Sequence, residues 1–201
     1  MRRSDACDYN EPRDGLALTW QSFIAAALPG SVWCALPNIG KDIVNTVKAF
    51  GLNCVILSGG ESYSAYPERD ETESTLIDLC IKEKIPLIGI CRGFQMLHTF
   101  LGGRTAEVSP DKHVAKRHSV YFKKNPFVPA GEASVNSFHS NGINLDTLIE
   151  PFVPLALDAE GFVEAAYSLN YKQIGLMWHP EREESFSETD FAIFRSLFKT
   201  I

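Results

Sequence analysis

The stretch Ile85–Phe100 reads IPLIGICRGFQMLHTF and carries three local signals in a row. Its opening, IPLIGI, is an apolar run typical of a strand buried on both faces of a parallel sheet. The following residues, FQMLHTFL, place apolar side chains at helical spacing. Cys91 lies between the two, with Gly89 two residues before it and Gly93 two residues after it. A strand, a tight turn around one nucleophilic side chain and a helix together describe a nucleophile elbow.

The predicted position of Cys91 has a chemical consequence. At the N-terminus of a helix, unpaired backbone N–H groups and the helix dipole favour a thiolate. A lone cysteine at the end of a buried strand is more often a small apolar core residue. The elbow alone therefore leaves both interpretations open, and the rest of the chain has to decide between them.

Length and composition predict one soluble globular domain over residues 1–201. Apolar residues make up 45% and charged residues 22% of the chain, and the net charge is −6. A general nucleic-acid-binding protein would carry a basic face, so the acidic balance argues against that class. The sequence contains no apolar run near the ~20 residues that span a bilayer, and no apolar segment directly follows the charged N-terminus as in a secretory signal.

Cysteine spacing argues against a metal site or a disulfide scaffold. The five cysteines are odd in number, widely separated and never arranged as CxxC: Cys7, Cys34, Cys54, Cys80 and Cys91. We therefore expect neither structural zinc nor disulfides, and we expect the reducing cytoplasm as the compartment.

The first half of the chain alternates predicted strands and helices, which indicates an α/β fold with a largely parallel sheet. We expect helices over Asp14–Leu28, Lys41–Phe50 (with Gly51 as its C-cap) and Glu71–Lys84. We expect strands over Ser31–Pro37 and Cys54–Leu57 ahead of the central strand, with a polar loop over Glu61–Glu71.

The second half is richer in β structure. Short segments separated by turns predict antiparallel hairpins laid against the α/β core: His118–Phe122, Ala133–Phe138, Leu155–Asp158 and Phe162–Ser168. A further apolar strand, Gln173–Trp178, leads into His179-Pro180-Glu181, and an amphipathic helix over Glu188–Lys199 closes the chain.

A cysteine nucleophile needs a base that takes its proton and a third group that orients the base. His179 is the best candidate base because it directly follows a buried strand, as Cys91 does. Parallel strands that end at one edge of a sheet bring their terminal residues together. Glu181 can then hold the imidazole in the required tautomer, although HPE by itself is more often an ordinary loop.

The other four histidines are weaker candidates. His98 lies inside the predicted elbow helix, and His139 ends a strand from which it could line the site. His113 and His118 flank a basic loop, and their spacing does not place both on one helix face. We therefore predict no metal site and no cofactor.

GICRGFQML followed by MWHPER resembles the class I glutamine amidotransferase family, over most of the chain. The resemblance implies a flavodoxin-like, mostly parallel central sheet flanked by helices, with a small antiparallel extension. It implies Cys91 as nucleophile, His179 as general base and acid, and Glu181 as the orienting carboxylate. Ser58–Gly60 falls where the family has its oxyanion loop, so the backbone N–H groups of Gly60 and Arg92 would form the oxyanion hole.

Within that family, the finer resemblance is to the γ-glutamyl-γ-aminobutyrate hydrolases of the peptidase C26 type. It is carried by Arg92, by VNSFHS at Val135–Ser140 and by YNEPRDGLALTW at Tyr9–Trp20. The compact length resembles the γ-glutamyl-CDP-amidate hydrolases. No clear first strand precedes YNEPRDG, so that strand is either missing from the start or replaced. The resemblance implies four residues that hold the amino-acid head of a γ-glutamyl substrate: Gln95, Glu61, Ser137 and His139.

We therefore expect a hydrolase that cleaves a γ-glutamyl amide and releases glutamate, with a small-molecule partner and no nucleic acid or membrane. A homodimer is left open. One alternative is a glutaminase subunit that supplies ammonia to a synthase partner. Another is a non-enzymatic flavodoxin-like module that senses redox state or binds a ligand, which would not need the pair formed by His179 and Glu181.

Overall fold

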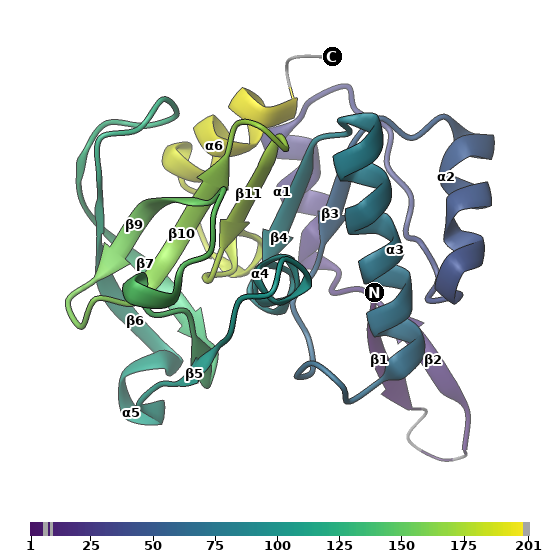
Figure 1. Ribbon diagram of the computed structural model, residues 1–201, viewed down its shortest axis with the longest axis horizontal. Helices are drawn as coiled ribbons and strands as arrows, with labels where there is room; N and C mark the ends of the chain where they lie inside the picture. The colour runs from purple at the N-terminus through teal and green to yellow at the C-terminus, as the bar shows by residue number, and fades with distance from the viewer. Residues whose placement is uncertain (6–7, 9, 199–201) are drawn as a thin grey trace.

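The computed structural model describes residues 1–5, 8 and 10–198, and it shows an α/β fold built on one curled sheet (Figure 1). This sheet has seven strands in the order β3-β4-β11-β10-β9-β6-β7. Their bounds are β3 Val55–Leu57, β4 Leu87–Ile90, β6 Val114–Phe122, β7 Gly131–Phe138, β9 Val153–Asp158, β10 Val163–Ser168 and β11 Gln173–Leu176.

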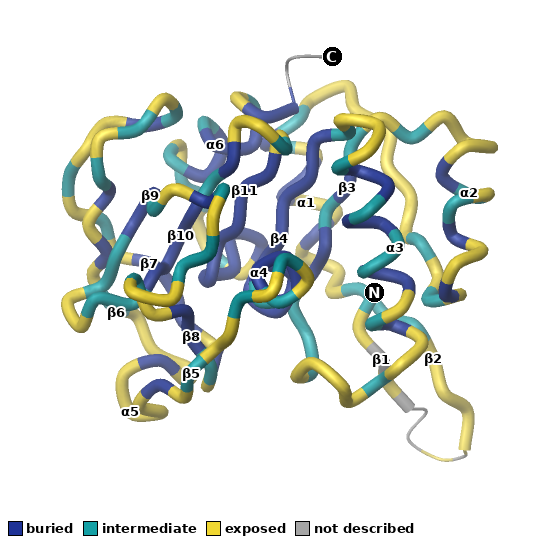
Figure 2. The backbone as a smooth tube through the Cα atoms, viewed as in Figure 1, coloured by how far each residue is buried: buried dark blue, intermediate teal, exposed yellow. Residues whose placement is uncertain are grey.

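The parallel part of the sheet carries the elbow. Strand β4 lies between β3 and β11 and runs parallel to both, with Ile90 opposite Leu176. Every residue of β4 and β11 is buried, as the predicted apolar runs require (Figure 2). The carboxyl ends of β4 and β11 consequently lie side by side, and the next residues in each chain segment leave the sheet at the same edge.

The antiparallel extension is larger than the sequence suggested. Strand β10 pairs antiparallel with β11, and β9, β6 and β7 continue the same sheet in antiparallel order. The expected antiparallel hairpins are confirmed, but they supply four of the seven strands and extend the central sheet instead of packing against it. Periodicity identifies such strands without telling which edge they pair with, because pairing is a tertiary property.

Helices cover both faces of the sheet and create two apolar cores (Figure 1). Side chains such as Ile88 and Ile90 of β4 pack in a core with α1 and α6, whereas Leu87 packs in a core with α2, α3 and α4. The bounds are α1 Thr19–Ala27, α2 Ile43–Phe50, α3 Pro67–Glu83, α4 Arg92–Phe100 and α6 Glu188–Phe198. The predicted α2 is confirmed, and Gly51 ends it in the left-handed conformation expected of a C-cap.

Three predicted boundaries were wrong. Residues Ser31–Pro37 form no strand, and Val32 in this segment is 98% exposed. The segment instead runs along a groove beside β3, which it lines together with Trp20 and Leu52. Helix α1 starts later than Asp14, since Pro12–Gly15 forms a strand instead. Helix α3 starts at Pro67, inside the predicted loop, because proline fits the first turn of a helix.

The remaining elements are small. Strand β1 (Arg2–Asp5) pairs with β2 (Pro12–Gly15) in a ribbon separate from the main sheet, and β5 (Ala106–Glu107) pairs with β8 (Asn141–Gly142). A short helix, α5 (Pro110–His113), precedes β6. Cys7 and the predicted last helical residue, Lys199, lie outside the described residues. Within the described ranges, no helix has both the length and the apolar character needed to cross a membrane. The prediction of a single domain stays a prediction.

Candidate active site

Cys91 occupies the sharp turn between β4 and α4 that the sequence predicts. Its backbone has φ 51° and ψ −106°, a strained conformation for a residue with a side chain, as expected at a nucleophile elbow. Two glycines make this turn possible. A Cβ on Gly89 would lie 2.6 Å from the backbone carbon of Gly93, and a Cβ on Gly93 would lie 2.3 Å from the carbonyl oxygen of Leu57. Neither position can hold another residue without moving the backbone.

The Cys91 thiol is not poised as a thiolate in the resting site. Burial raises the pKa of Cys91 to about 12, although the backbone N–H of Arg92 and the charge of Arg182 act in the opposite direction. The predicted effect of the helix N-terminus, which favours the thiolate, is therefore present but is outweighed by burial. Cys91 is therefore a thiol in this site, and attack by its sulfur would require a base that takes the proton.

The predicted base, His179, follows β11 and is held by Glu181. Nδ1 of His179 lies 2.8 Å from Oε1 of Glu181, and both side chains are 2% exposed. In the neutral imidazole Nδ1 then donates to the carboxylate, which leaves Nε2 with the lone pair that a base needs. The described residues show no hydrogen bond between Cys91 and His179 in this resting state, and such contacts commonly tighten when substrate binds.

Two residues that the sequence analysis did not single out fix the position of His179. The side-chain amide of Asn136 on β7 accepts from the backbone N–H of His179 at 2.9 Å and donates to its carbonyl oxygen at 2.8 Å. The ring of Phe138 packs edge-on against the imidazole, with centroids 5.7 Å apart. Both lie in VNSFHS, so the segment was recognised, but the role of its asparagine and phenylalanine required the tertiary structure.

The predicted oxyanion loop, Ser58–Gly60, rests on a buried arginine. The guanidinium of Arg69 donates to the carbonyl oxygens of Ser58 at 2.9 Å and of Gly59 at 3.1 Å. Gly60 has φ 154°, and a Cβ there would lie 2.2 Å from Arg69 Nη1, so this position also requires glycine. The guanidinium of Arg69 thus fixes the loop through its carbonyl oxygens. Gly59 packs against the imidazole, since a Cβ there would lie 2.4 Å from Cε1 of His179.

An ionic network connects this loop to the elbow. Glu73 pairs with Arg69 at 2.7 Å and also with the Arg92 guanidinium, which pairs in turn with Asp70. The side chains of Arg69, Glu73 and Arg92 are at most 4% exposed. The sequence analysis used only the backbone of Arg92 and missed its partners. The one local signal was the spacing of Arg69 and Glu73, which are four residues apart on α3.

The four predicted substrate-binding residues divide into two places. Gln95 Nε2 and His139 Nδ1 both contact the carbonyl oxygen of Asn141, at 2.8 and 3.1 Å, so these two residues lie together. The Ser137 hydroxyl is buried and donates to the carbonyl oxygen of His113. Glu61 belongs to the other side, where its carboxylate pairs with Arg2 and Arg69. Their roles in substrate binding stay predictions.

Comparison with known proteins decides the family. The family model described as Peptidase C26 matches residues 58–181, a segment that contains the elbow and His179-Pro180-Glu181. The chain belongs to the peptidase C26 family.

The relatives of this C26 chain include two named hydrolases. It is 34% identical over 186 residues to gamma-glutamyl-CDP-amidate hydrolase of Campylobacter jejuni subsp. jejuni, which covers 89% of this chain and 86% of that protein. It is 27% identical over 163 residues to gamma-glutamyl-gamma-aminobutyrate hydrolase PuuD of Escherichia coli (strain K12), covering 70% of this chain and 61% of that protein.

A solved glutamine amidotransferase from Thermotoga maritima shares the fold of this C26 chain. The TM-score is 0.56 at 18% identity, with 79% of this chain and 76% of that chain covered. The predicted fold family and its resemblance to class I glutamine amidotransferases are therefore confirmed.

One buried carboxyl behind the C26 site makes stability depend on pH. Asp190 on α6 accepts a hydrogen bond from the indole N–H of Trp178 at 2.9 Å, next to His179 in the chain. Burial, together with the nearby carboxylates of Glu183 and Glu181, raises the pKa of Asp190 from 3.8 to about 7, although the hydrogen bond from Trp178 acts in the opposite direction. The folded protein then holds a proton that the unfolded chain releases above about pH 4. This contribution to stability is complete below pH 4 and is lost as the pH rises through 7.

We expect Asp190→Asn to remove this dependence, because the amide oxygen still accepts from Trp178 and does not titrate. The free energy of unfolding of the wild type should fall between pH 4 and pH 8 relative to the variant, with an upper bound of about 4 kcal/mol for the pKa difference. Urea unfolding at several pH values measures this. An identical pH profile for the two proteins would show that Asp190 ionises freely in the fold.

Proposed function

We propose that this chain is a γ-glutamyl hydrolase that cleaves a γ-glutamyl amide through a Cys91 thioester and releases glutamate. The observation that supports it most is the convergence of Cys91 with the pair formed by His179 and Glu181 at the ends of two adjacent parallel strands. The similarity to gamma-glutamyl-CDP-amidate hydrolase over most of both chains supports the substrate class. Membership of a peptidase family also sets aside the non-enzymatic redox or binding module.

In the proposed reaction, His179 Nε2 takes the thiol proton as the Cys91 sulfur attacks the γ-carbonyl carbon. The carbonyl oxygen becomes an oxyanion that accepts hydrogen bonds from the backbone N–H groups of Gly60 and Arg92, each worth about 3–4 kcal/mol of the barrier. The C–N bond then breaks, and the imidazolium gives its proton to the leaving nitrogen, which departs as an amine or amidate. The γ-glutamyl thioester remains.

The second half of the reaction uses the same groups. His179 removes a proton from water, the resulting oxygen nucleophile attacks the thioester carbonyl, and the carbon–sulfur bond breaks. The protonated imidazole returns a proton to Cys91, and glutamate leaves. Glu181 does not exchange protons in this scheme, because its task is to keep Nδ1 protonated and the ring in place.

We further propose γ-glutamyl-CDP-amidate as the preferred substrate, with simple γ-glutamyl amines as slower ones. The support is that the relative named for this substrate covers more of the chain, at higher identity, than PuuD does.

The described cysteines Cys34, Cys54, Cys80 and Cys91 are free thiols, which supports the expected reducing cytoplasm.

Glutamate release by the purified chain alone tests the proposal. We expect release from γ-glutamyl-CDP-amidate, slower release from γ-glutamyl-γ-aminobutyrate, and none from the isomer linked through the α-carboxyl. The α-linked isomer is the matched control because it has the same atoms and the same charge. Hydrolysis of glutamine alone, and only after a synthase is added, would instead establish the ammonia-supplying alternative.

A further inference from the structure

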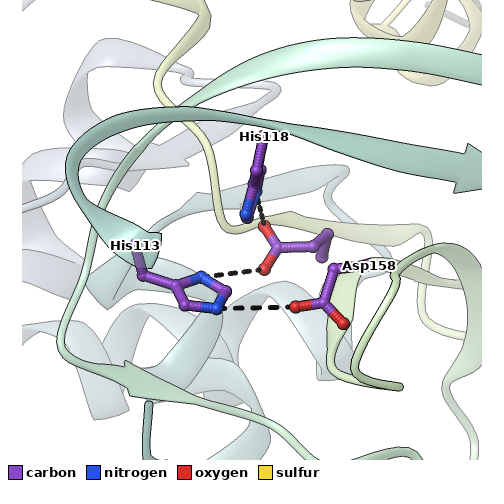
Figure 3. A group of neighbouring side chains, drawn as sticks. His113, His118 and Asp158 are labelled. Atoms are coloured by element: carbon purple, nitrogen blue, oxygen red, sulfur yellow. Dashed lines mark ion pairs between the residues drawn. The ribbon is translucent and has the colours of Figure 1, made fainter. Parts of the chain in front are cut away.

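Four side chains that the proposed reaction does not use converge in the antiparallel half of the fold (Figure 3). They are His113 at the end of α5, His118 on β6, Asp158 at the end of β9 and Glu164 on β10. One donor atom from each lies within 4.8 Å of the donor atoms of the other three. The sequence argument against a metal pair considered only a common helix face. The turn from α5 into β6 brings the rings of His113 and His118 to 4.9 Å instead.

Several polar atoms of the cluster are buried and have no hydrogen-bond partner within 3.5 Å with suitable geometry. Both carboxylate oxygens of Glu164, Nδ1 of His113 and Nε2 of His118 are buried atoms without a hydrogen-bond partner. The side chains of Glu164 and His113 are each 1% exposed. A buried charged carboxylate without hydrogen bonds is costly, and native proteins rarely leave several such atoms in one place. Among the described residues, Glu164 faces the imidazoles of His113, His118 and His139 at 3.8, 3.4 and 3.5 Å, which are long contacts for a buried carboxylate.

The separations fit a small ion. His118 Nε2 lies 3.4 Å from Glu164 Oε2, and His113 Nε2 lies 3.5 Å from Asp158 Oδ2. Nε2 is therefore the His113 atom that would bind the ion, and its Nδ1 faces Glu164 Oε1 at 3.8 Å. Ligand atoms about 2.0–2.1 Å from a tetrahedral zinc are separated from one another by about 3.3 Å. The two observed distances are close to this value, whereas they are long for hydrogen bonds between charged groups.

Protons alone do not satisfy the cluster as well as a dication does. His139 also adjoins it, with Nδ1 on the carbonyl oxygen of Asn141 and Nε2 3.5 Å from Glu164 Oε1. In its neutral form His139 therefore points a lone pair at a carboxylate oxygen. Protonating His113, His118 and His139 together would crowd three cations, since the ring of His113 is 4.9 Å from each of the other two. A divalent ion balances Asp158 and Glu164 while the imidazoles stay neutral.

We propose that His113, His118, Asp158 and Glu164 bind one divalent transition-metal ion, with zinc as the best match to two imidazoles and two carboxylates. The ion joins α5, β6, β9 and β10, which otherwise meet through strand pairing. The role of the ion is structural. The site lies close to the predicted base, since the carbonyl oxygen of Glu164 accepts a hydrogen bond from the backbone N–H of Met177, two residues before His179. This proposal does not depend on the proposed function.

Titration with zinc tests the site directly. Protein carrying Cys91→Ser, which removes the active-site thiol as a competing ligand, is stripped with a chelator, dialysed and titrated with zinc chloride in a calorimeter. We expect one equivalent to bind, and at a hundredfold excess over Kd we expect Tm to rise by about 5 °C or more. The cobalt-substituted protein should show d–d bands without a thiolate-to-cobalt charge-transfer band.

Isosteric variants assign the ligands. Glu164→Gln and His118→Gln should each weaken zinc binding by at least about tenfold. Asp158→Asn should also weaken it, while keeping the Oδ1 atom that accepts from the backbone of Glu160 and Phe162. His98→Gln is the control, because His98 is a buried histidine that belongs to α4 and contacts Thr147 instead of the cluster.

The outcomes separate clearly. Loss of the bound equivalent in Glu164→Gln and its retention in His98→Gln would establish the site. Folded protein that takes up no zinc, zinc affinity unchanged in both Glu164→Gln and Asp158→Asn, or a thiolate band in the cobalt spectrum would each overturn the proposal. The readouts are metal content, affinity and spectra, so loss of hydrolase activity by itself would not count for or against it.

Discussion

Replacing Cys91 with alanine is expected to lower the turnover of the γ-glutamyl substrate by about 10⁴-fold or more, because no covalent intermediate can form without the sulfur. Stability should change by no more than about 1 kcal/mol, since alanine keeps the Cβ and leaves only a small cavity. Glutamate release and urea unfolding, measured on the same preparation, separate loss of chemistry from loss of fold.

Cys80→Ala is the matched control for this experiment. Cys80 on α3 is also a buried thiol, and burial raises its pKa to about 12 as well. It lies in the core with α2 and not at the carboxyl edge of the sheet. We expect the Cys80 variant to retain its activity. Full activity of Cys91→Ala would contradict the proposed mechanism whatever the Cys80 variant does.

Removing the charge of Glu73 is expected to be the most destabilising single substitution in the site. Glu73→Gln leaves the guanidinium groups of Arg69 and Arg92 buried without their shared carboxylate, and breaking a buried ion pair in this way costs about 3–5 kcal/mol. Arg69 holds the predicted oxyanion loop through two carbonyl oxygens, so kcat should fall together with stability. Denaturant unfolding measures the first effect, and glutamate release below the unfolding transition measures the second.

Asp78→Asn provides the comparison within the same helix. Asp78 and Lys82 form another ion pair four residues apart on α3, but their side chains are 47% and 68% exposed. An exposed pair of this kind contributes about 0.3–0.5 kcal/mol. If Glu73→Gln lowered the free energy of unfolding by as little as Asp78→Asn does, the buried ionic network would not be what holds the elbow and the loop together.

The sequence predicted the parts of the site that are local in the chain. Gly89, Cys91 and Gly93 are within five residues, and a strand, a strained turn and a helix leave a pattern over that distance. The same holds for His179 and Glu181, whose hydrogen bond joins residues two apart. The residues that support them could not be read in this way, because Asn136 is 43 residues from the His179 backbone that it holds.

The sequence by itself determined the α/β class, the elbow at Cys91 and the histidine and carboxylate that follow the closing strand, because each depends on spacing within a few residues. Only the tertiary structure decided that Ser31–Pro37 pairs with no strand, that burial keeps the Cys91 thiol protonated, and that His113, His118, Asp158 and Glu164 meet. Strand pairing, desolvation and clustering depend on which distant segments pack together, and no local pattern records that.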